Sequence, residues 1–434
     1  MTHARTVKLD IHHLTRVEGH GNIVVDVRKG EIKECRWEVP EAPRFFEAML
    51  RGRMWHELHH ITSRICGICS IGHAIASVKA TEAAMGIMVR TQTKNLRRLC
   101  LHAENIQSHI LHLGYLVLPD LMGVGSVIPL ARTHPAEVTT VVRLHRLANE
   151  MSDMLCGRTT HPQRIVPGGF TRLPGKKELE NLRNRLKDSI PDLQAVADLV
   201  LSVAGGLPPF ERETEYIALV HPDEYPLYEG DIGSTDGGTW PVSEYRKIVN
   251  EYVVPHSTAK YARHNRDSYM VGALARLNLN EEWLSPLAKK LAGSFNLKAV
   301  NRNSFMNNIA QLVECAHSVE DSIRLIGEIL DDELEAEEPD IRPRAGCGVS
   351  AVEVPRGILF HEYEYDNEGR CVNANCVIPT NQNHGNIQRD LEALLPSLLS
   401  KGEKEIELGM EMLVRAYDPC VSCSTHLLRV QFER

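Results

Sequence analysis

Two cysteine-containing stretches near opposite ends of the 434-residue chain decide its fold: RICGICSIGH at residues 64–73 and DPCVSCSTH at residues 418–426. Each stretch contains one C-x-x-C pair, and the four cysteines are Cys66, Cys69, Cys420 and Cys423. Two such pairs offer four sulfur ligands, which soft or borderline metals prefer. A helix start beside a pair lowers the thiol pKa and favours the metal-binding thiolate. We therefore predict a fold that brings both ends of the chain to one metal site.

The spacing of the pairs bears on which metal they hold. Structural zinc is the ordinary occupant of two C-x-x-C pairs, but a zinc ribbon separates its pairs by roughly 15 to 20 residues, and a four-cysteine iron–sulfur cluster also usually comes from a compact run. Here nearly the whole chain separates the pairs. Arg64, His73, Asp418 and His426 flank them, and a histidine three or four residues after a cysteine on a helix can donate to a thiolate or bind a second ion. So many charged side chains beside sulfur ligands are costly unless the site uses them. This favours a reactive metal centre, with structural zinc and an iron–sulfur cluster as alternatives.

The composition is that of a folded protein without a nucleic-acid or membrane role. The chain is 43% hydrophobic and 24% charged, which excludes a disordered or fibrous protein, and its net charge of −8 gives no basic surface for nucleic acid. The N-terminus has neither the apolar core of a secretory signal nor a twin-arginine pair. The apolar stretch Ile110 to Met122 is shorter than the roughly 18 to 20 residues of a membrane span. We expect a cytoplasmic protein, in which eleven cysteines indicate metal or redox chemistry rather than disulfides.

Hydrophobic periodicity predicts an α+β fold, mainly α, with a core of long helices and small β elements near the N-terminus and in the C-terminal third. Alternating runs predict strands within residues 6–40, with a hairpin turn at Lys29-Gly30, and within residues 346–380. Residues 205–255 are expected to be rich in loops. The helices are expected at 55–120 (closed by Pro119), 134–156, 176–204, 281–294 and 304–335. We predict one large domain, 1–434, with a β region (1–54), a helical body (55–340), a C-terminal α/β part (341–426) and a tail (427–434).

At its cysteine motifs the chain resembles a known family. RICGICSIGH and DPCVSCSTH are similar to the two signature motifs of the nickel–iron hydrogenase large subunit. Five further segments follow the order of the family: TRVEGHGNI (15–23), APRFFEAM (42–49), SHILHLGYLVLPD (108–120), VPRGILFH (354–361) and CVIPT (376–380). The resemblance therefore covers nearly the whole chain. It implies the large-subunit fold and the reversible heterolytic cleavage of H2 into protons and electrons.

The resemblance also implies a nickel–iron centre, Ni-Fe(CN)2(CO). Cys66 and Cys420 resemble the terminal thiolates on nickel, and Cys69 and Cys423 resemble the thiolates that bridge nickel to iron. Glu18 resembles the carboxylate that relays the proton outward from a terminal cysteine. Heterolytic cleavage needs a hydride acceptor and a proton acceptor side by side, which a thiolate-ligated metal and a poised base supply.

Further residues complete the implied site. Arg356 resembles the guanidinium over the open metal face, positioned by Asp120 and Asp418, and its five donors suit cyanide nitrogens. The residues expected to bind the cofactor are Pro355, Pro379, Thr380 and His73. The residues that resemble ligands of a separate Mg2+ or Fe2+, a harder cation, are Glu47, Cys376 through its carbonyl, and His426. As ordinary structural residues, Glu18 would be a hairpin-edge carboxylate, Glu47 an ion-pair partner and Arg356 a cap on a buried carbonyl.

Partner chains are implied as well. The sequence has neither further cysteine clusters for an iron–sulfur chain nor a G-x-G-x-x-G after a strand for a dinucleotide. Electrons are therefore expected to leave through an iron–sulfur small subunit, and then through a flavin-containing diaphorase or a heterodisulfide-reductase-type partner. Enzymes of the soluble branch exchange electrons with pyridine nucleotides, a deazaflavin or a heterodisulfide-reductase partner, and the type linked to NAD(P) resembles the chain best. A maturation protease is expected to remove residues 427–434 after His426. Two alternatives remain: an H2-sensing regulatory protein of the same fold, and a quinone-oxidoreductase-like subunit, whose known relatives lack the four cysteines.

Overall fold

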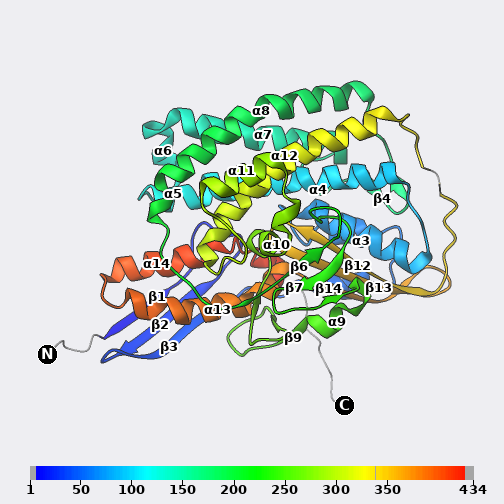
Figure 1. Cartoon of the computed structure of the whole chain (residues 1–434). Helices are drawn as coiled ribbons and strands as arrows, with labels where there is room; N and C mark the ends of the chain where they lie inside the picture. Colours follow the sequence, from blue (N-terminus) through cyan, green and yellow to red (C-terminus); the bar gives the residue numbers. More distant parts are fainter. Residues whose placement is uncertain (1–5, 338, 426–434) are drawn as a thin grey trace, which may run out of the picture.

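Four long helices form one side of the molecule, in the upper part of Figure 1. The computed structural model describes residues 6–337 and 339–425. The four helices are α4 (Thr91–Leu111), α7 (Pro135–Cys156), α8 (Lys176–Val203) and α12 (Asn307–Asp331). α4 packs against α7 and α12, and α8 packs against the same two helices. α7 and α8 each bury one apolar face, whereas α4 is buried along most of its length. α4 is thus the interior helix, from which polar side chains can reach a buried site.

The N-terminal strands form an antiparallel sheet of order β1-β2-β3. They are β1 (Val7–Ile11), β2 (Asn22–Arg28) and β3 (Glu31–Glu38). Lys29 and Gly30 have φ angles of 53° and 81°, as a two-residue hairpin turn of the primed type requires. The predicted hairpin is confirmed.

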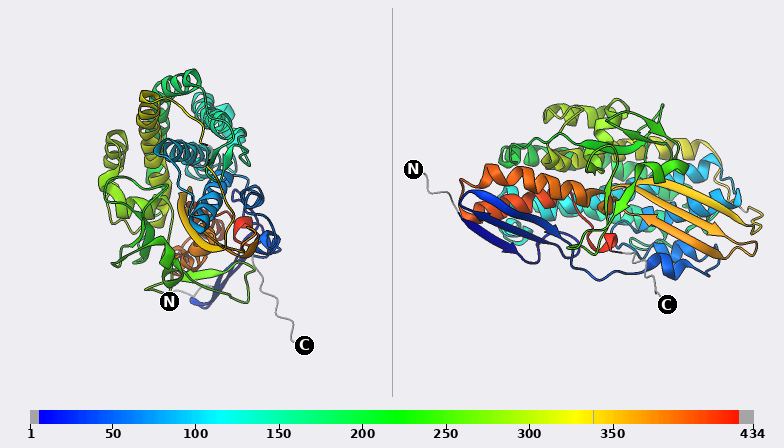
Figure 2. Two further views of the ribbon diagram at one scale, coloured as in Figure 1. Left: turned by 90° about the vertical axis from the view of Figure 1, so that its right-hand side faces the viewer. Right: turned by 90° about the horizontal axis from the view of Figure 1, so that it is seen from below.

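A second antiparallel sheet, of order β12-β13-β14, lies in the C-terminal third of the chain. Its strands are β12 (Gly346–Val354), β13 (Gly357–Tyr365) and β14 (Cys371–Val377). α3 (Ser70–Met85) packs against β12 and β13. Figure 2 shows the two sheets at opposite ends of the underside, with the segment that follows α14 (Glu403–Ala416) between them. The strands predicted within residues 346–380 are confirmed.

Residues 205–255 are rich in loops, as the sequence predicted, but they also contain short strands that it did not predict. They contribute three strands to a sheet of order β11-β6-β7-β8. The strands are β6 (Glu215–Val220), β7 (Asp231–Ser234), β8 (Thr239–Trp240) and, parallel to β6, β11 (Tyr269–Met270). Every residue of β6 except Val220 is buried. A strand buried on both faces lacks the polar–apolar alternation by which strands are recognised, so β6 was not predicted.

The helical run that Pro119 was predicted to close ends close to that residue, at Leu121. α4 ends at Leu111, a wider π-helical turn spans His112–Val117, and α5 (Leu118–Leu121) follows directly. Pro119 is the second residue of α5, directly after the π-helical turn. The helical run continues for only two residues beyond Pro119, close to the predicted end at residue 120.

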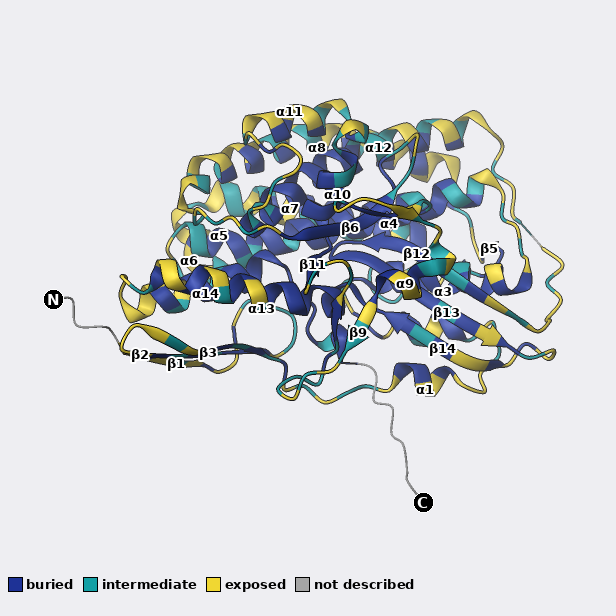
Figure 3. Cartoon of the chain, turned by 60° about the horizontal axis from the view of Figure 1, so that its bottom comes forward, coloured by how far each residue is buried: buried dark blue, intermediate teal, exposed yellow. Residues whose placement is uncertain are grey.

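The remaining elements are short or flank the sheets. The other helices are α1 (Phe46–Leu50), α2 (Leu58–Thr62), α6 (Val127–Thr133), α9 (Tyr245–Ile248), α10 (Ala273–Asn280), α11 (Pro286–Ser294) and α13 (Pro379–Leu398). The other strands are β4 (Ile165–Val166), β5 (Gly169–Phe170), β9 (Asn250–Tyr252) and β10 (Tyr261–Arg263). Buried residues concentrate in α4, β6 and α10 at the centre of the molecule (Figure 3). Within the described ranges no helix has both the length and the apolarity to cross a bilayer. The predicted α+β fold, mainly α, is confirmed.

Candidate metal centre

The first cysteine pair lies at the start of a helix. Cys69 is the residue before α3, and Cys66 lies in the loop that precedes it. Cys66 Sγ accepts a hydrogen bond from the backbone N–H of Cys69 at 3.0 Å, and both side chains are buried. Burial raises the pKa of the Cys66 thiol, but hydrogen bonds from Cys69 and the charge of the Arg356 guanidinium outweigh it, and the pKa is lowered. The site therefore favours a thiolate at Cys66.

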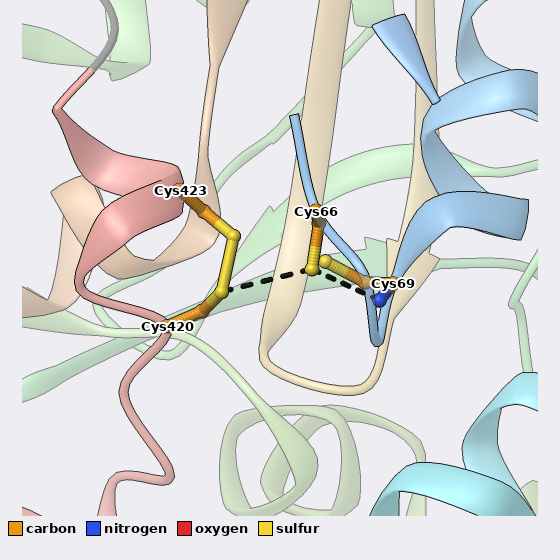
Figure 4. Close-up of side chains that lie close together, drawn as sticks. All are labelled: Cys66, Cys69, Cys420 and Cys423. Atoms are coloured by element: carbon orange, nitrogen blue, oxygen red, sulfur yellow. Dashed lines mark hydrogen bonds between the residues drawn. A yellow bond between two sulfur atoms is a disulfide. The ribbon is translucent and has the colours of Figure 1, made fainter. Parts of the chain in front are cut away.

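The second pair follows α14 near the other end of the chain. Cys420 and Cys423 are buried, and Cys423 lies in a single 3-10 turn, Ser422–Ser424. Their Sγ atoms are joined as a disulfide in this structure (Figure 4). The backbone N–H of Cys420 donates to Thr380 Oγ1 at 3.1 Å, and Cys420 forms a parallel β-bridge with Glu18. Contacts with distant segments thus hold this pair.

The two pairs meet at one point. Cys66 Sγ lies 3.6 Å from Cys420 Sγ, and all four Sγ atoms lie within 4.8 Å of one another (Figure 4). In the part of the chain that the structure describes, this is the one group of His, Cys, Asp and Glu side chains close enough to hold a metal ion. Once the Cys420–Cys423 disulfide is reduced, the four buried sulfurs fit a thiophilic metal, such as nickel or iron. The predicted meeting of the two chain ends is confirmed.

Glu18 places a carboxylate beside the second pair. Its Oε2 atom lies 3.1 Å from Cys420 Sγ and accepts the backbone N–H of Ser422 at 3.1 Å. Its Oε1 atom accepts the hydroxyl of Ser422, and its backbone oxygen accepts the N–H of Val421 at 2.9 Å. Gly19, at a φ of +84°, permits this approach, because a Cβ there would lie 2.7 Å from the Ser422 nitrogen. Glu18 is therefore held against a cysteine sulfur and is not an isolated hairpin-edge carboxylate.

Arg356 places a positive charge beside the cysteines. It lies in the two-residue turn between β12 and β13, and 4% of its surface is exposed. Its Nη2 atom donates to Asp418 Oδ1 at 2.7 Å, and its Nε atom donates to the backbone oxygen of Asp418. Burial lowers the pKa of Arg356, but Asp418 and the sulfurs of Cys69 and Cys66 outweigh it and raise the pKa. The guanidinium stays charged, and its predicted partner Asp418 is in place.

Asp120 does not lie where the sequence placed it. Its carboxylate accepts hydrogen bonds from Arg16 Nη2 at 2.5 Å and from Arg415 Nε and Nη2 at 2.6 and 3.0 Å. These two arginines occupy both carboxylate oxygens, and no described contact joins Asp120 to Arg356. The prediction that Asp120 positions Arg356 is corrected accordingly. Because Arg16 precedes Glu18 and Arg415 lies in the last turn of α14, Asp120 instead ties the Glu18 segment to the helix that leads into the second cysteine pair.

The residues expected to bind the cofactor lie on three segments: the start of α13, the β12–β13 turn and α3. Pro379 and Thr380 begin α13, and Thr380 directly contacts the second pair through the Cys420 N–H. Pro355 precedes Arg356 in the β12–β13 turn. The ring of His73 was expected to meet a thiolate or a second ion; its Nδ1 atom lies 3.2 Å from Nε2 of His361 on β13.

Two of the three expected ligands of a second cation are described. Glu47 lies in α1 and is 1% exposed, and the buried Cys376 lies in β14, against which α1 packs. Burial, and then the nearby Glu47 carboxylate, raises the pKa of the Cys376 thiol, which indicates that the two residues are neighbours. The third expected ligand, His426, and the tail at residues 427–434 lie outside the described residues.

Glu104, on α4, is a buried carboxylate beside the first pair that the sequence did not reveal. Its Oε1 atom accepts the N–H of Ile71 at 2.7 Å, and its Oε2 atom accepts the N–H of Gly72 at 3.0 Å. These are N–H groups of the first turn of α3, which have no helical partner. Burial raises the pKa of Glu104 to about 8. The sequence offered one signal: Glu104 lies on the face of α4 that the apolar periodicity assigns to the core, where an acidic residue is unusual.

Known proteins resemble this chain over most of its length. A family model described as nickel-dependent hydrogenase matches residues 44–140 and 242–426, and one described as HoxL-like matches residues 8–42. The chain is 32% identical to sulfhydrogenase 1 subunit alpha of Pyrococcus furiosus, over 97% of this chain and 98% of the relative. It is 28% identical to the NAD-reducing hydrogenase HoxS subunit beta of Cupriavidus necator, over 97% and 95%. The crystal structure of an NAD+-reducing [NiFe]-hydrogenase in the H2-reduced state superposes with a TM-score of 0.86 at 26% identity, over 97% of this chain and 99% of that chain.

The fold and the four-sulfur site define the metal-binding large subunit of a hydrogenase, an oxidoreductase. The chain belongs to the nickel-dependent hydrogenase family. The predicted family, fold and class of enzyme are thereby confirmed.

Proposed function

We propose that this chain cleaves H2 heterolytically and reversibly at a nickel–iron centre that the four cysteines hold, with carbon monoxide and cyanide on the iron. The observation that carries the proposal is the carboxylate beside the sulfur cluster: Glu18 Oε2 lies 3.1 Å from Cys420 Sγ. When bound, the nickel–iron group supplies the Lewis acidity and the redox capacity for the cleavage. The chain supplies the ligands and the path for the proton.

The sulfurs and Glu18 receive the proton. The four cysteines would hold the metal group: Cys66 and Cys420 would bind nickel alone, and Cys69 and Cys423 would bind both nickel and iron. One of the two protons from H2 moves to the sulfur of Cys420 and then to Oε2 of Glu18, which lies 3.1 Å from that sulfur. The second proton and the two electrons also leave the chain, so that each cleavage returns the site to its starting state.

Arg356 and its neighbours shape the rest of the site. The guanidinium keeps a fixed positive charge beside the sulfurs without itself exchanging a proton, because its pKa is raised. Pro355, Pro379 and Thr380 line the pocket of the diatomic ligands. Thr380 also fixes the backbone of Cys420 through its hydroxyl.

A second cation, Mg2+ or Fe2+, completes the proposed structure. Glu47, the carbonyl oxygen of Cys376 and His426 provide oxygen and nitrogen donors, which suit a harder cation than the four sulfurs do. The burial of Glu47 and its closeness to Cys376 support this assignment.

The chain works as one subunit of a larger enzyme, because similar proteins are the alpha and beta subunits of hydrogenases. Its immediate partner is an iron–sulfur small subunit, and flavin-containing or heterodisulfide-reductase-type subunits pass the electrons on. The similarity to an NAD-reducing hydrogenase supports NAD(P) as the final acceptor and a cytoplasmic location. A maturation protease removes residues 427–434.

The proton path is tested with Glu18→Gln in the purified complex. Gln keeps the shape of the side chain but cannot take a proton, so we expect unchanged nickel and iron content and hydrogen–deuterium exchange of H2 slowed by about 100-fold or more. Glu31→Gln, on the exposed end of β3, is the matched control and should exchange at the normal rate. Unchanged exchange in Glu18→Gln would remove Glu18 from the path. A wild-type complex without nickel would contradict the metal assignment itself.

A further inference from the structure

Arg276 is a buried charged residue that none of the proposed steps uses. It lies in α10, and 0% of its surface is exposed. An arginine without access to water is costly unless acceptors meet its donors and opposite charge meets its own. The partners of Arg276 therefore indicate what the residue does.

All five N–H donors of the Arg276 guanidinium are used. Nε and one hydrogen of Nη2 bind the two oxygens of Glu314, at 2.6 and 2.7 Å. One hydrogen of Nη1 binds Glu353 Oε2 at 2.8 Å. The two remaining donors bind the backbone oxygens of Val354 at 2.9 Å and Pro355 at 3.1 Å. A guanidinium has five donors in a rigid plane, so this set of acceptors fixes its orientation completely.

The two backbone oxygens belong to the residues that lead into Arg356. The oxygen of Pro355 is part of the peptide bond between Pro355 and Arg356, and that bond is planar. A donor that holds this oxygen also fixes the direction of the Arg356 N–H and limits rotation about its backbone. Arg276 therefore fixes the position of the backbone from which the Arg356 side chain extends.

The same turn is confined from its other side. Gly357 has a φ of +132°, and a Cβ there would lie 2.9 Å from the Gly272 nitrogen. Gly272 has a φ of +119°, and a Cβ there would lie 3.3 Å from the backbone oxygen of Arg356. The Arg276 N–H in turn binds the oxygen of Gly272 at 2.9 Å. The start of α10 and the Arg356 turn thus lie in direct contact.

The two carboxylates that orient Arg276 are themselves anchored. Glu314, on α12, also accepts His109 Nε2 at 2.8 Å and the Tyr225 hydroxyl at 2.5 Å. Glu353 also accepts the N–H of Leu219 on β6 at 2.8 Å. The guanidinium is therefore fixed to α12 and β6, elements that do not carry the cysteines.

We propose that Arg276 is a positioning residue, which holds the Val354–Pro355 backbone and so places the Arg356 guanidinium beside the four cysteines. This inference rests on the function proposed above for Arg356. It assigns to α10 a task in catalysis although α10 supplies no metal ligand.

Arg276→Lys in the purified complex tests the inference. Lysine keeps the charge but has three donors on one nitrogen, so it cannot serve both carboxylates and both backbone oxygens. Arg97→Lys is the matched control: Arg97 is also 0% exposed and binds Glu82 through two donors and Tyr228 through a third, away from the turn. Both variants are made in the wild-type and the Arg356→Lys background, and kcat is measured with an artificial electron acceptor.

We expect Arg276→Lys to lower kcat by about tenfold or more at unchanged nickel content and KM, because a catalytic group displaced by about 1 Å loses much of its effect. In the Arg356→Lys background it should lower kcat by less than about twofold, since residues that act through one another are not additive. Arg97→Lys should change kcat by the same factor in both backgrounds. Equal factors for Arg276→Lys in the two backgrounds would overturn the inference.

Backbone amide hydrogen exchange over residues 356–358 gives a readout independent of turnover. Arg276→Lys should speed this exchange and Arg97→Lys should not; unchanged exchange in Arg276→Lys overturns the inference. If Arg356→Lys alone leaves kcat unchanged, the function proposed for Arg356 fails, and the exchange alone then decides the positioning role. If Arg276→Lys does not fold, Glu314→Gln replaces it, because it weakens the hold on the same guanidinium. Glu82→Gln is then the control, and the same outcomes are expected.

Discussion

The two cysteine pairs reach the metal centre through different kinds of contact. Cys69 is the residue before α3, Cys66 lies in the loop that leads into it, and the N–H of Cys69 binds the sulfur of Cys66. Cys420 instead depends on Glu18, near the opposite end of the chain, and on Thr380 of α13. A helix builds the first pair, and the assembly of distant segments builds the second.

This difference predicts how each pair responds to a remote substitution. Hydrogen bonds within a helix start remain when a distant contact is lost, because the residues that make them are neighbours in sequence. The second pair has only a single 3-10 turn of its own, so its position depends mainly on its tertiary partners. Substitutions far from the metal should therefore disturb the second pair more than the first.

The largest effect is expected from Asp120→Ala, which removes the tie between the Glu18 segment and α14. Arg415 has 1% of its side chain exposed and Asp120 3%, so the substitution leaves a buried arginine without its main partner. Breaking a buried pair in this way costs about 3 to 5 kcal/mol of folding free energy. We expect a lower unfolding temperature in calorimetry and a lower nickel content, because the second pair is no longer held.

Asp192→Ala is the control for this prediction. Asp192 pairs with Arg143, whose side chain is 58% exposed, and such a surface pair contributes about 0 to 1 kcal/mol. If the Asp120 and Asp192 variants unfold at the same temperature with full nickel, the second pair does not depend on the remote tie.

Buried histidines give the comparison a pH dependence. His59, in α2, lies before the first pair and His384, in α13, lies near the second; burial lowers the pKa of each to about 3. In the unfolded chain a histidine has a pKa near 6.5. Below about pH 6.5 each of these histidines is therefore protonated in the unfolded state but neutral in the folded state. Stability present above about pH 6.5 is therefore lost as the pH falls toward 3, by at most about 1.4 kcal/mol per pH unit and histidine.

Replacing each histidine by leucine separates the two sites. Neither ring nitrogen of His59 has a hydrogen-bond partner among the described residues. His59→Leu should therefore reduce the loss of stability at acid pH and leave the stability at neutral pH unchanged. His384 accepts Trp37 Nε1 at 2.9 Å and lies 2.9 Å from Ser424 Oγ. His384→Leu should also reduce the loss of stability at acid pH. At neutral pH, however, it should lower the free energy of unfolding by about 1 to 3 kcal/mol, since the buried N–H of Trp37 is left unpaired. Unfolding temperatures measured between about pH 4 and 8 decide this, and an equal cost of both substitutions at neutral pH would contradict it.

The parts of the fold that the sequence revealed are those with a long or repeated signal. The helices expected at 134–156 and 176–204 are α7 and α8, to within one residue at each end, because an apolar period sustained over more than five turns is hard to mistake. The two C-x-x-C pairs also carry their own signal. The short strand β6 does not, since burial on both faces removes its alternation.

The supports of the site were hidden for a different reason. A sequence does not show whether a charged residue is buried, and the partners of Arg276 and Glu104 lie on other elements: Arg276 binds Glu314 of α12, and Glu104 binds the start of α3. Asp120 was assigned to the wrong arginine for the same reason, because Arg16 and Arg415 become its neighbours only after the chain ends meet. Residues that hold ligands in place are therefore less visible in a sequence than the ligands themselves.

Two glycines of the first motif test whether the position of the first pair depends only on local contacts. A Cβ at Gly72 would lie 2.1 Å from Val354 Cγ1 and 2.8 Å from Glu104 Oε2, whereas a Cβ at Gly67 would meet nothing within 4 Å. Gly72→Ala should lower the free energy of unfolding by about 1 to 3 kcal/mol through overpacking, although alanine is the better helix former. Gly67→Ala should stay within about 0.5 kcal/mol of the wild type. Because Val354 leads into the turn of Arg356, Gly72→Ala should also lower kcat. A Gly72→Ala complex with wild-type unfolding temperature and kcat would show that α3 does not press on that turn, and that the helix start alone holds the first pair.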